Sequence, residues 1–179
     1  MINHRIITED QRELYLYGLR LLCEKLLGIV SMFVICVLAK GVVEGAVFYI
    51  TYSFLRKYAG GYHAGSFISC YLSSCAAVLL CVMLSKTECS QMLSLIFMIT
   101  GAPVILVLAP VEHPAKPLEE CEIIRYRKLT RIISVVEILI FVTFYCLGFY
   151  SLCFSVGYGF LLLSLLLVIQ KLNNSRKSK

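Results

Sequence analysis

The sequence predicts an all-α integral membrane protein with about six transmembrane helices. Hydrophobic residues make up 59% of its 179 residues, only 16% are charged, and the mean hydropathy is +0.83. Soluble domains carry about 25% charged residues. Apolar runs of about 20 residues, the length that a helix needs to cross a bilayer, recur along the chain. Lys and Arg gather in alternate polar segments, as in proteins that cross the membrane several times.

The elements are expected in the following order. Segment 1–20 is polar and amphipathic and lacks the pattern of a cleaved signal peptide, so we expect it to be retained. Residues 21–55 are interrupted by a charged, glycine-containing stretch at 40–45, which predicts two short helices that either cross the membrane or re-enter on the same side. Four clear spans follow, at 65–84, 92–110, 132–150 and 152–170.

The longest polar segment between spans is residues 111–131. Pro114 and Pro117 exclude a helix at its start. The apolar spacing after Pro117 predicts a short amphipathic helix that lies at the membrane interface. Residues 172–179 are expected to form a solvated polar tail, and no repeat or change in composition divides the chain. We therefore expect a single membrane domain, 1–179.

The distribution of basic residues predicts the orientation in the membrane. Fifteen of the 17 Lys and Arg residues lie in one set of polar segments, and only Lys40 and Lys86 lie in the other. Because Lys and Arg are retained on the cytoplasmic side, both termini are expected to be cytoplasmic. The basic residues flank apolar segments and form no patch interleaved with aromatic residues, so the net charge of +6 does not predict a nucleic-acid partner.

The segment "RKYAGGYHAGSFISC", residues 56–70, contains a candidate catalytic pair, His63 and Cys70. A cysteine attacks as its thiolate, and a neighbouring imidazole can take its proton and later protonate a leaving amine. An unbroken helix would separate these two residues by about 10 Å. Gly60 and Gly61 permit a tight turn, so we expect the helix to begin after His63. The spacing alone leaves open an interfacial histidine and a cysteine that only packs.

Other charged residues have two interpretations each. Arg56 either binds a carboxylate through both of its guanidinium nitrogens or only anchors the helix at the cytoplasmic side. Glu112 and Lys116 lie in a polar segment predicted on that same side and could approach the candidate pair. Glu137 lies inside a predicted span, where an ionisable group suggests a function, but it could instead pair with a base. The candidate bases for that pair are Arg20, Lys25 and Arg131.

The nine cysteines are an odd number and lie mostly inside apolar runs, which favours reduced thiols over a disulfide framework. His63, Cys70 and Cys75 lack the paired close spacings of zinc ligands. We therefore expect neither a metal nor another cofactor.

Residues 56–70 resemble the signature of the accessory gene regulator B (AgrB) family, in which an Arg, a Gly-Gly-x-His and a Cys seven residues later mark a membrane-embedded cysteine endopeptidase. The chain length, the six predicted spans and the segment "APVEHPAKPL" extend this likeness over nearly the whole chain. The resemblance implies that His63 and Cys70 are the catalytic pair, supported by Arg56, Gly60 and Gly61.

The resemblance also implies the reaction and the partners. The family's substrate is a short AgrD-like precursor with an amphipathic leader, a pheromone segment and an acidic tail. The tail is removed through an acyl-enzyme thioester, and the pheromone is closed into a thiolactone or lactone for quorum sensing. A homodimer in the bacterial cell membrane, with its active site at the cytoplasmic face, is expected.

A different class of function stays open beside this one. A small transporter or peptide exporter would have several spans and an intramembrane carboxylate, and Cys70 would then be inert. A membrane scaffold without catalysis is a third alternative. The lack of an internal repeat and the gathering of reactive residues at one membrane face favour the peptidase.

Overall fold

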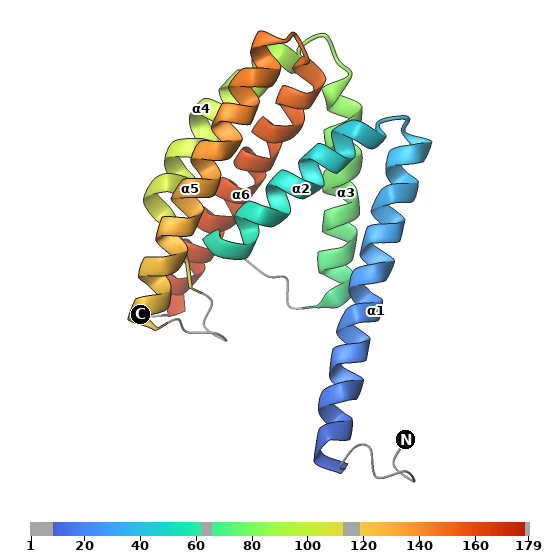
Figure 1. Ribbon diagram of the computed structural model, residues 1–179, viewed down its shortest axis with the longest axis vertical. Helices are drawn as coiled ribbons and strands as arrows, with labels where there is room; N and C mark the ends of the chain where they lie inside the picture. Colours follow the sequence, from blue (N-terminus) through green and yellow to red (C-terminus); the bar gives the residue numbers. More distant parts are fainter. Residues whose placement is uncertain (1–8, 62–65, 113–118, 178–179) are drawn as a thin grey trace.

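The computed structural model of the protein describes residues 9–61, 66–112 and 119–177. Within these ranges the chain is helical and contains no strand, which confirms the predicted all-α class (Figure 1). The helices are α1 (Glu9–Leu38), α2 (Val42–Ala59), α3 (Phe67–Ser85), α4 (Ser90–Leu108), α5 (Glu120–Cys146) and α6 (Tyr150–Lys177).

Five helices in the described part of the chain are long and apolar enough to cross a membrane, namely α1, α3, α4, α5 and α6. Helix α2 has 18 residues and carries Glu44, Arg56 and Lys57, and it is not one of the five. It runs obliquely across the other helices in Figure 1. The protein is therefore a multi-pass membrane protein, and a sixth crossing by α2 stays a prediction.

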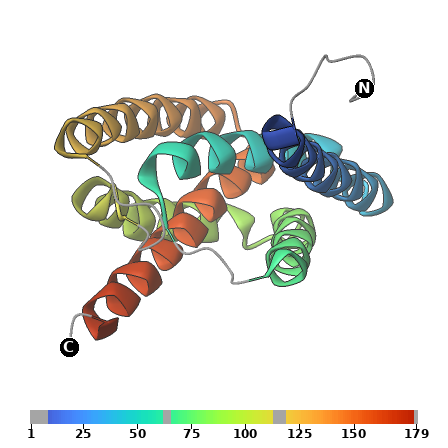
Figure 2. The same cartoon turned by 90° about the horizontal axis from the view of Figure 1, so that it is seen from below.

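Helix α6 forms the centre of the bundle. In the apolar stretch of this helix 56% of the residues are buried, compared with 6% in α1, and Figure 2 shows α6 between α4, α5 and α2. Small residues let it approach α4 closely, because a Cβ on Gly157 would lie 2.7 Å from the carbonyl oxygen of Ser94. A Cβ on Gly101 would likewise lie 2.8 Å from the carbonyl carbon of Phe160. Such close backbone approach is typical of helices that associate within lipid.

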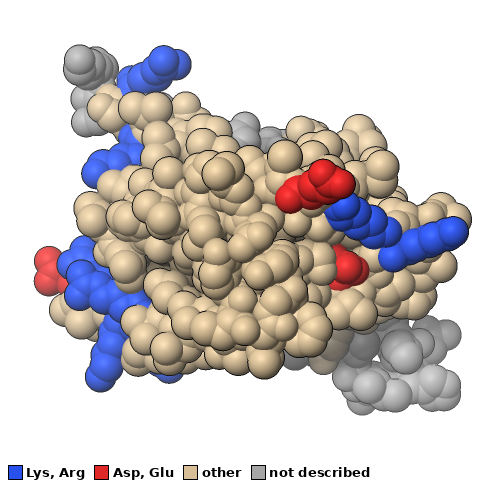
Figure 3. Space-filling model, turned by 90° about the horizontal axis from the view of Figure 1, so that it is seen from above, with Lys and Arg blue, Asp and Glu red and all other residues tan. Residues whose placement is uncertain are grey.

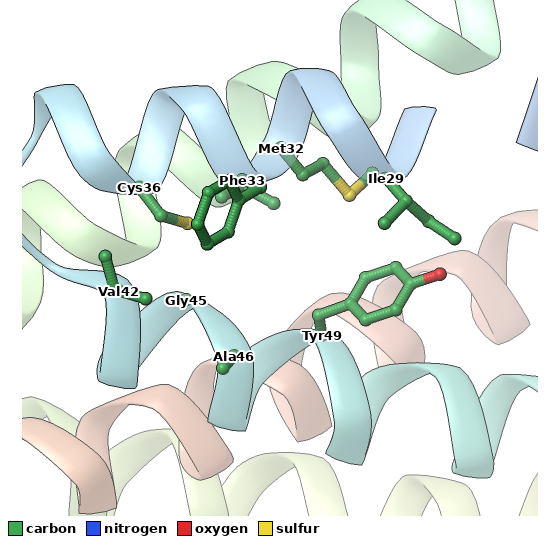
Figure 4. A pocket seen from close by; sticks show the side chains of 9 residues that line it. Ile29, Met32, Phe33, Cys36, Val42, Gly45, Ala46 and Tyr49 are labelled. Carbon is green, nitrogen blue, oxygen red and sulfur yellow. The ribbon is translucent and has the colours of Figure 1, made fainter. Parts of the chain in front are cut away.

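Helix α1 lies outside this bundle and contacts α2 and α3. Its end is fastened by Lys86, whose Nζ donates hydrogen bonds to the carbonyl oxygens of Ala39 (2.6 Å) and Lys40 (3.1 Å). An apolar groove of about 210 Å³ lies between α1, α2 and α3. Figure 4 shows that α1 contributes Ile29, Met32, Phe33 and Cys36 to its wall, and α2 contributes Val42, Gly45, Ala46 and Tyr49.

The start of α5 differs from the sequence prediction. A separate interfacial helix was expected after Pro117, but residues 120–131 are the first turns of one continuous helix that runs to Cys146. Glu119 caps this helix, and Glu122 completes the capping box by accepting a hydrogen bond from the backbone N–H of Glu119. No Gly or Pro follows before Cys146, so nothing in the sequence ends the helix between the polar and apolar parts.

Both ends of the chain extend their helices beyond the apolar spans. Helix α6 continues to Lys177, through most of the segment expected as a polar tail. A side-chain hydrogen bond from Gln170 to Asn174, one turn apart, supports this extension. At the N-terminus, the second half of the amphipathic segment 1–20 belongs to α1, which is helical from Glu9.

The helices alternate in direction, so one end of the bundle collects several helix termini. We call this the motif end; it is formed by the ends of α2, α4 and α6 and the starts of α3 and α5 (Figure 1). Basic residues are frequent there, including Arg56, Lys57 and Arg125. Figure 3 views the molecule from the opposite end, where uncharged surface predominates. Which end faces the cytoplasm stays a prediction.

Candidate active site

Cys70 is the fourth residue of α3. The helix begins here because Ser66 caps it: the Ser66 side-chain oxygen accepts a hydrogen bond from the backbone N–H of Ser69 (3.2 Å). The Cys70 N–H makes the first regular helical bond, to the carbonyl oxygen of Ser66 (3.2 Å). Its thiol is free and half-buried. The expectation that the helix begins after His63 is therefore confirmed, and Cys70 lies at the end of the first turn.

His63 itself lies outside the described residues, as does Lys116. The pairing of His63 with Cys70, and any approach of Lys116, therefore stay predictions. The chain is described on both sides of His63, up to Gly61 and from Ser66 onward.

The two glycines of the motif form the turn that ends α2. Gly60 has a φ of +76° and Gly61 a φ of +117°, values that residues with a side chain adopt only at a cost. The N–H of Gly60 still donates to the carbonyl oxygen of Arg56 (3.2 Å), closing the last turn. A Cβ on Gly60 would collide with the carbonyl oxygen of Val111. Glycine is thus required at 60 by both conformation and space.

Val111, which follows α4, is bonded through its backbone to the residues at this turn. The backbone N–H of Val111 donates to the carbonyl oxygen of Ala59 (3.0 Å), and Val111 forms a parallel β-bridge with Gly60. Glu112 follows directly, and its carbonyl oxygen accepts a hydrogen bond from the Asn174 side chain of α6 (2.9 Å). Glu112 thus follows the residue that contacts the motif and itself bonds to α6, and an approach of its carboxylate to the candidate pair stays a prediction.

Arg56 lies in the last turn of α2, one turn after Tyr52. Its Nη1 donates a hydrogen bond to the Tyr52 hydroxyl, and its guanidinium carbon lies 5.4 Å from the centre of the Tyr52 ring. Tyr52 thus orients the Arg56 guanidinium at the end of α2.

Sequence reasoning missed Tyr52, Gln170 and Asn174. For Tyr52 the available signal was its spacing of four residues from Arg56, which places the two on one helix face. For Asn174 there was no such signal, because its partner Glu112 lies 62 residues away in the chain.

Glu137 lies on the buried face of α5 and is 5% exposed. The predicted pairing with a base is not found among the described residues; Arg20 instead binds Glu24 on its own helix (3.0 Å). Thr130 and Ser134 share the buried face, and like Glu137 each has a side-chain oxygen without a hydrogen-bond partner in residues 9–61, 66–112 and 119–177. This row of polar atoms is separate from Cys70 in sequence and helix.

All nine cysteines are free thiols. Among the residues that the structure describes, no three His, Cys, Asp or Glu side chains gather closely enough to hold a metal ion. The described part of the candidate site therefore consists of a thiol, a guanidinium, a phenol and a braced glycine turn.

Comparisons with known proteins agree with the motif. The model of the family described as Accessory gene regulator B matches residues 1–170. An AgrB-like protein from Clostridium perfringens strain SM101 (Type A) is 29% identical over 174 residues, covering 87% of this chain and 81% of the relative. An AgrB-like protein 2 from strain 13 (Type A) is 25% identical over 118 residues, covering 62% of this chain and 55% of the relative. No solved structure matches the chain.

The family model spans almost the full length, and the fold is the multi-pass helical one that the sequence predicted. The chain therefore belongs to the accessory gene regulator B family, and its role lies in the accessory gene regulator system.

Proposed function

We propose that this protein is a membrane-embedded cysteine endopeptidase that removes the acidic C-terminal tail of an AgrD-like precursor peptide and promotes its macrocyclisation. The observation that carries the proposal is the position of Cys70. This half-buried free thiol lies at the capped start of α3, seven residues after His63, in a chain that belongs to the accessory gene regulator B family.

The thiol of Cys70 is the nucleophile. Its sulfur attacks the scissile carbonyl carbon, and the imidazole of His63 takes the thiol proton. The same imidazole then returns the proton to the departing amine as the carbon–nitrogen bond breaks. The products are a thioester on Cys70 and a free acidic tail. The field of a helix N-terminus falls off within the first turn, and Cys70 lies at the end of that turn, so the imidazole provides most of the activation.

A thiol or hydroxyl within the peptide then attacks the thioester and releases Cys70. A thiol gives a thiolactone and a hydroxyl gives a lactone. Exchange between two thioesters nearly conserves free energy, whereas hydrolysis would discard it, so the site must limit the access of water. The half-buried position of Cys70 agrees with this requirement.

Charge at the motif end selects the substrate. Arg56 can bind a carboxylate of the acidic tail through two parallel hydrogen bonds, and Tyr52 orients its guanidinium. The other basic residues at this end, with Lys116, attract the tail over a longer range. Glu112 supports the site through its backbone. The motif end faces the cytoplasm, as the basic residues predict, and the peptide's amphipathic leader lies in the membrane interface beside it.

One observation favours a second function, a small transporter or peptide exporter. The buried face of α5 carries Thr130, Ser134 and Glu137, whose oxygens lack partners among the described residues. Polar groups at membrane depth often line a transport pathway. The exporter would use this face and would not need Cys70.

Mass spectrometry of the precursor peptide after co-expression separates the two functions. The wild type and the Cys75→Ala variant should remove the tail, and Cys70→Ala should leave the peptide intact. Cys75 is a matched control because it is also a half-buried free thiol on α3. A peptide that stays intact with the wild type, or that Cys70→Ala still processes, contradicts the peptidase and moves the preference to the exporter.

A further inference from the structure

We propose that Gln170 and Asn174, at the end of α6, are positioning residues that hold the Gly60–Gly61 turn in its active geometry. This inference deepens the proposed function and rests on it. Within the described part of the chain, neither residue makes a hydrogen bond to Cys70. Each acts through a chain of hydrogen bonds that runs from α6 through Glu112 and Val111 to the motif.

The first step of this chain is an oriented amide. The backbone carbonyl of Glu112 can only accept a hydrogen bond, so it faces the Nδ2 of Asn174, at 2.9 Å. The Oδ1 of Asn174 in turn accepts from the Nε2 of Gln170, also at 2.9 Å. Gln170 is 2% exposed. The buried Gln170 amide thus fixes which side of the Asn174 amide faces Glu112.

The second step transmits this position to the motif. Glu112 is bonded to Val111, whose N–H donates to the carbonyl oxygen of Ala59 (3.0 Å) and whose backbone forms the bridge with Gly60. A Cβ at Gly60 would collide with the Val111 carbonyl oxygen, so the two backbones pack directly against each other with no space between them. A shift of Glu112 therefore shifts the Gly60–Gly61 turn.

Helix α6 also forms the wall behind the turn. A Cβ on Gly61 would lie 3.7 Å from the Cβ of Leu166, which is one turn before Gln170 on α6. The turn is therefore held between α6 on one side and Val111 on the other. His63 follows Gly61 by two residues, so the placement of the base begins at this braced turn.

Positioning of this kind affects the chemical step more than substrate binding. A misplacement of about 1 Å can lower the rate about a hundredfold. Loss of an interaction that is made only in the transition state lowers kcat and leaves KM nearly unchanged. A residue that only stabilised the fold would instead lower the amount of active protein.

The test uses the full-length protein in lipid vesicles with a synthetic precursor peptide, and measures kcat and KM for tail release. Asn174→Asp replaces the donor that faces Glu112 with an acceptor, and we expect kcat to fall about tenfold to a hundredfold with KM changed by less than about threefold. Gln170→Leu keeps the Asn174 Nδ2 donor but removes the hydrogen bond that orients the Asn174 amide, and we expect a smaller loss of kcat. The matched control is Asn173→Asp, which adds the same charge one residue earlier.

Hydrogen exchange of the Val111 amide provides a readout that does not depend on activity. We expect exchange to accelerate in Asn174→Asp and Gln170→Leu and to match the wild type in Asn173→Asp. Wild-type kcat and wild-type exchange in both variants would overturn the positioning role while the peptidase stands, as would equal losses in Asn173→Asp. A wild type that releases no tail would instead remove the proposed function, and the positioning role with it.

Discussion

Arg56 donates a hydrogen bond to the hydroxyl of Tyr52, one turn earlier on α2, and its guanidinium carbon lies 5.4 Å from the centre of the same ring. Two contacts to one rigid side chain restrict the rotamers of a long cation. Tyr52 is itself held by stacking on Phe48, with ring centres 5.5 Å apart. The cation at the motif end is therefore oriented from within the bundle.

Removal of the Tyr52 hydroxyl should weaken tail release without unfolding the protein. Tyr52→Phe keeps the ring and its stacking but removes the acceptor for Arg56. Because a hydrogen bond to a charged group contributes about 1.5–3 kcal/mol, we expect tail release to slow by about tenfold to about 150-fold.

The control for this variant is Tyr49→Phe, on the same helix but in the wall of the apolar groove (Figure 4). It should process the peptide at the wild-type rate. Equal rates for Tyr52→Phe and Tyr49→Phe would show that the Arg56–Tyr52 contact has no part in the reaction.

Gly60→Ala should destabilise the turn and abolish processing. The added Cβ must occupy a residue with a φ of +76° and would collide with the Val111 carbonyl oxygen. Strain of this kind costs about 1–3 kcal/mol, and thermal unfolding in detergent measures it.

Gly18→Ala is the matched substitution for Gly60→Ala. Gly18 lies inside α1, and apart from its own stretch of helix a Cβ there would meet no described atom within 4 Å. Alanine favours the helix over glycine by about 0.5–1 kcal/mol, so this variant should unfold at the same or a slightly higher temperature. A similar loss of stability in both variants would contradict the assigned role of Gly60.

The helices could be predicted because lipid demands long apolar runs, and such runs are visible in a single sequence. The residues at which the helices begin and end were harder to predict. The residues at 120–131 and 172–177 are polar, and polarity marks where the membrane ends and not where the helix ends. Hydrogen bonding along the backbone continues until a cap or a breaker appears. Glu119 provides such a cap, whereas no breaker separates Gln170 from Lys177.

The candidate site could be predicted only in part, for a related reason. Gly60 and Gly61 indicated a turn because few other residues adopt positive φ. The partners of that turn, Val111 and Asn174, come from distant segments. Their hydrogen bonds depend on how α4 and α6 pack, and one sequence does not contain that information.

Replacement of Glu137 by an apolar residue of similar length should stabilise the protein. Glu137 is 5% exposed, and its Oε2 has no hydrogen-bond partner among the described residues. A buried polar group without a partner costs about 1–3 kcal/mol, so Glu137→Met should raise the unfolding temperature while tail release continues.

Glu24→Met is the control, because Glu24 forms a solvent-accessible ion pair with Arg20, and both residues lie on α1. Such pairs contribute about 0.5 kcal/mol or less, so this variant should unfold close to the wild type. Loss of peptide export in Glu137→Met with tail release intact would instead assign the α5 row to transport.

Lys86→Met should loosen the α1–α2 connection but leave processing unchanged. The Lys86 Nζ donates to two carbonyl oxygens at the end of α1, those of Ala39 and Lys40. No backbone N–H in the described part of the chain donates to these two carbonyls, so the Lys86 side chain acts as their cap. Because Lys86 is exposed, we expect a loss of about 1 kcal/mol or less. Hydrogen exchange should accelerate in the connection between α1 and α2, at residues 39–45.

This last variant separates stability from catalysis. The contact lies at the end of the bundle opposite Cys70, because α1 and α3 both end there (Figure 1). The Gly60–Val111 bridge is at the other end of α2 and shares no hydrogen bond with Lys86. Lys86→Met should therefore release the peptide tail at the wild-type rate despite faster exchange. A fall in kcat comparable with that expected for Asn174→Asp would mean that α2 transmits motion along its whole length, and that the braces at Val111 and Asn174 do not isolate the motif.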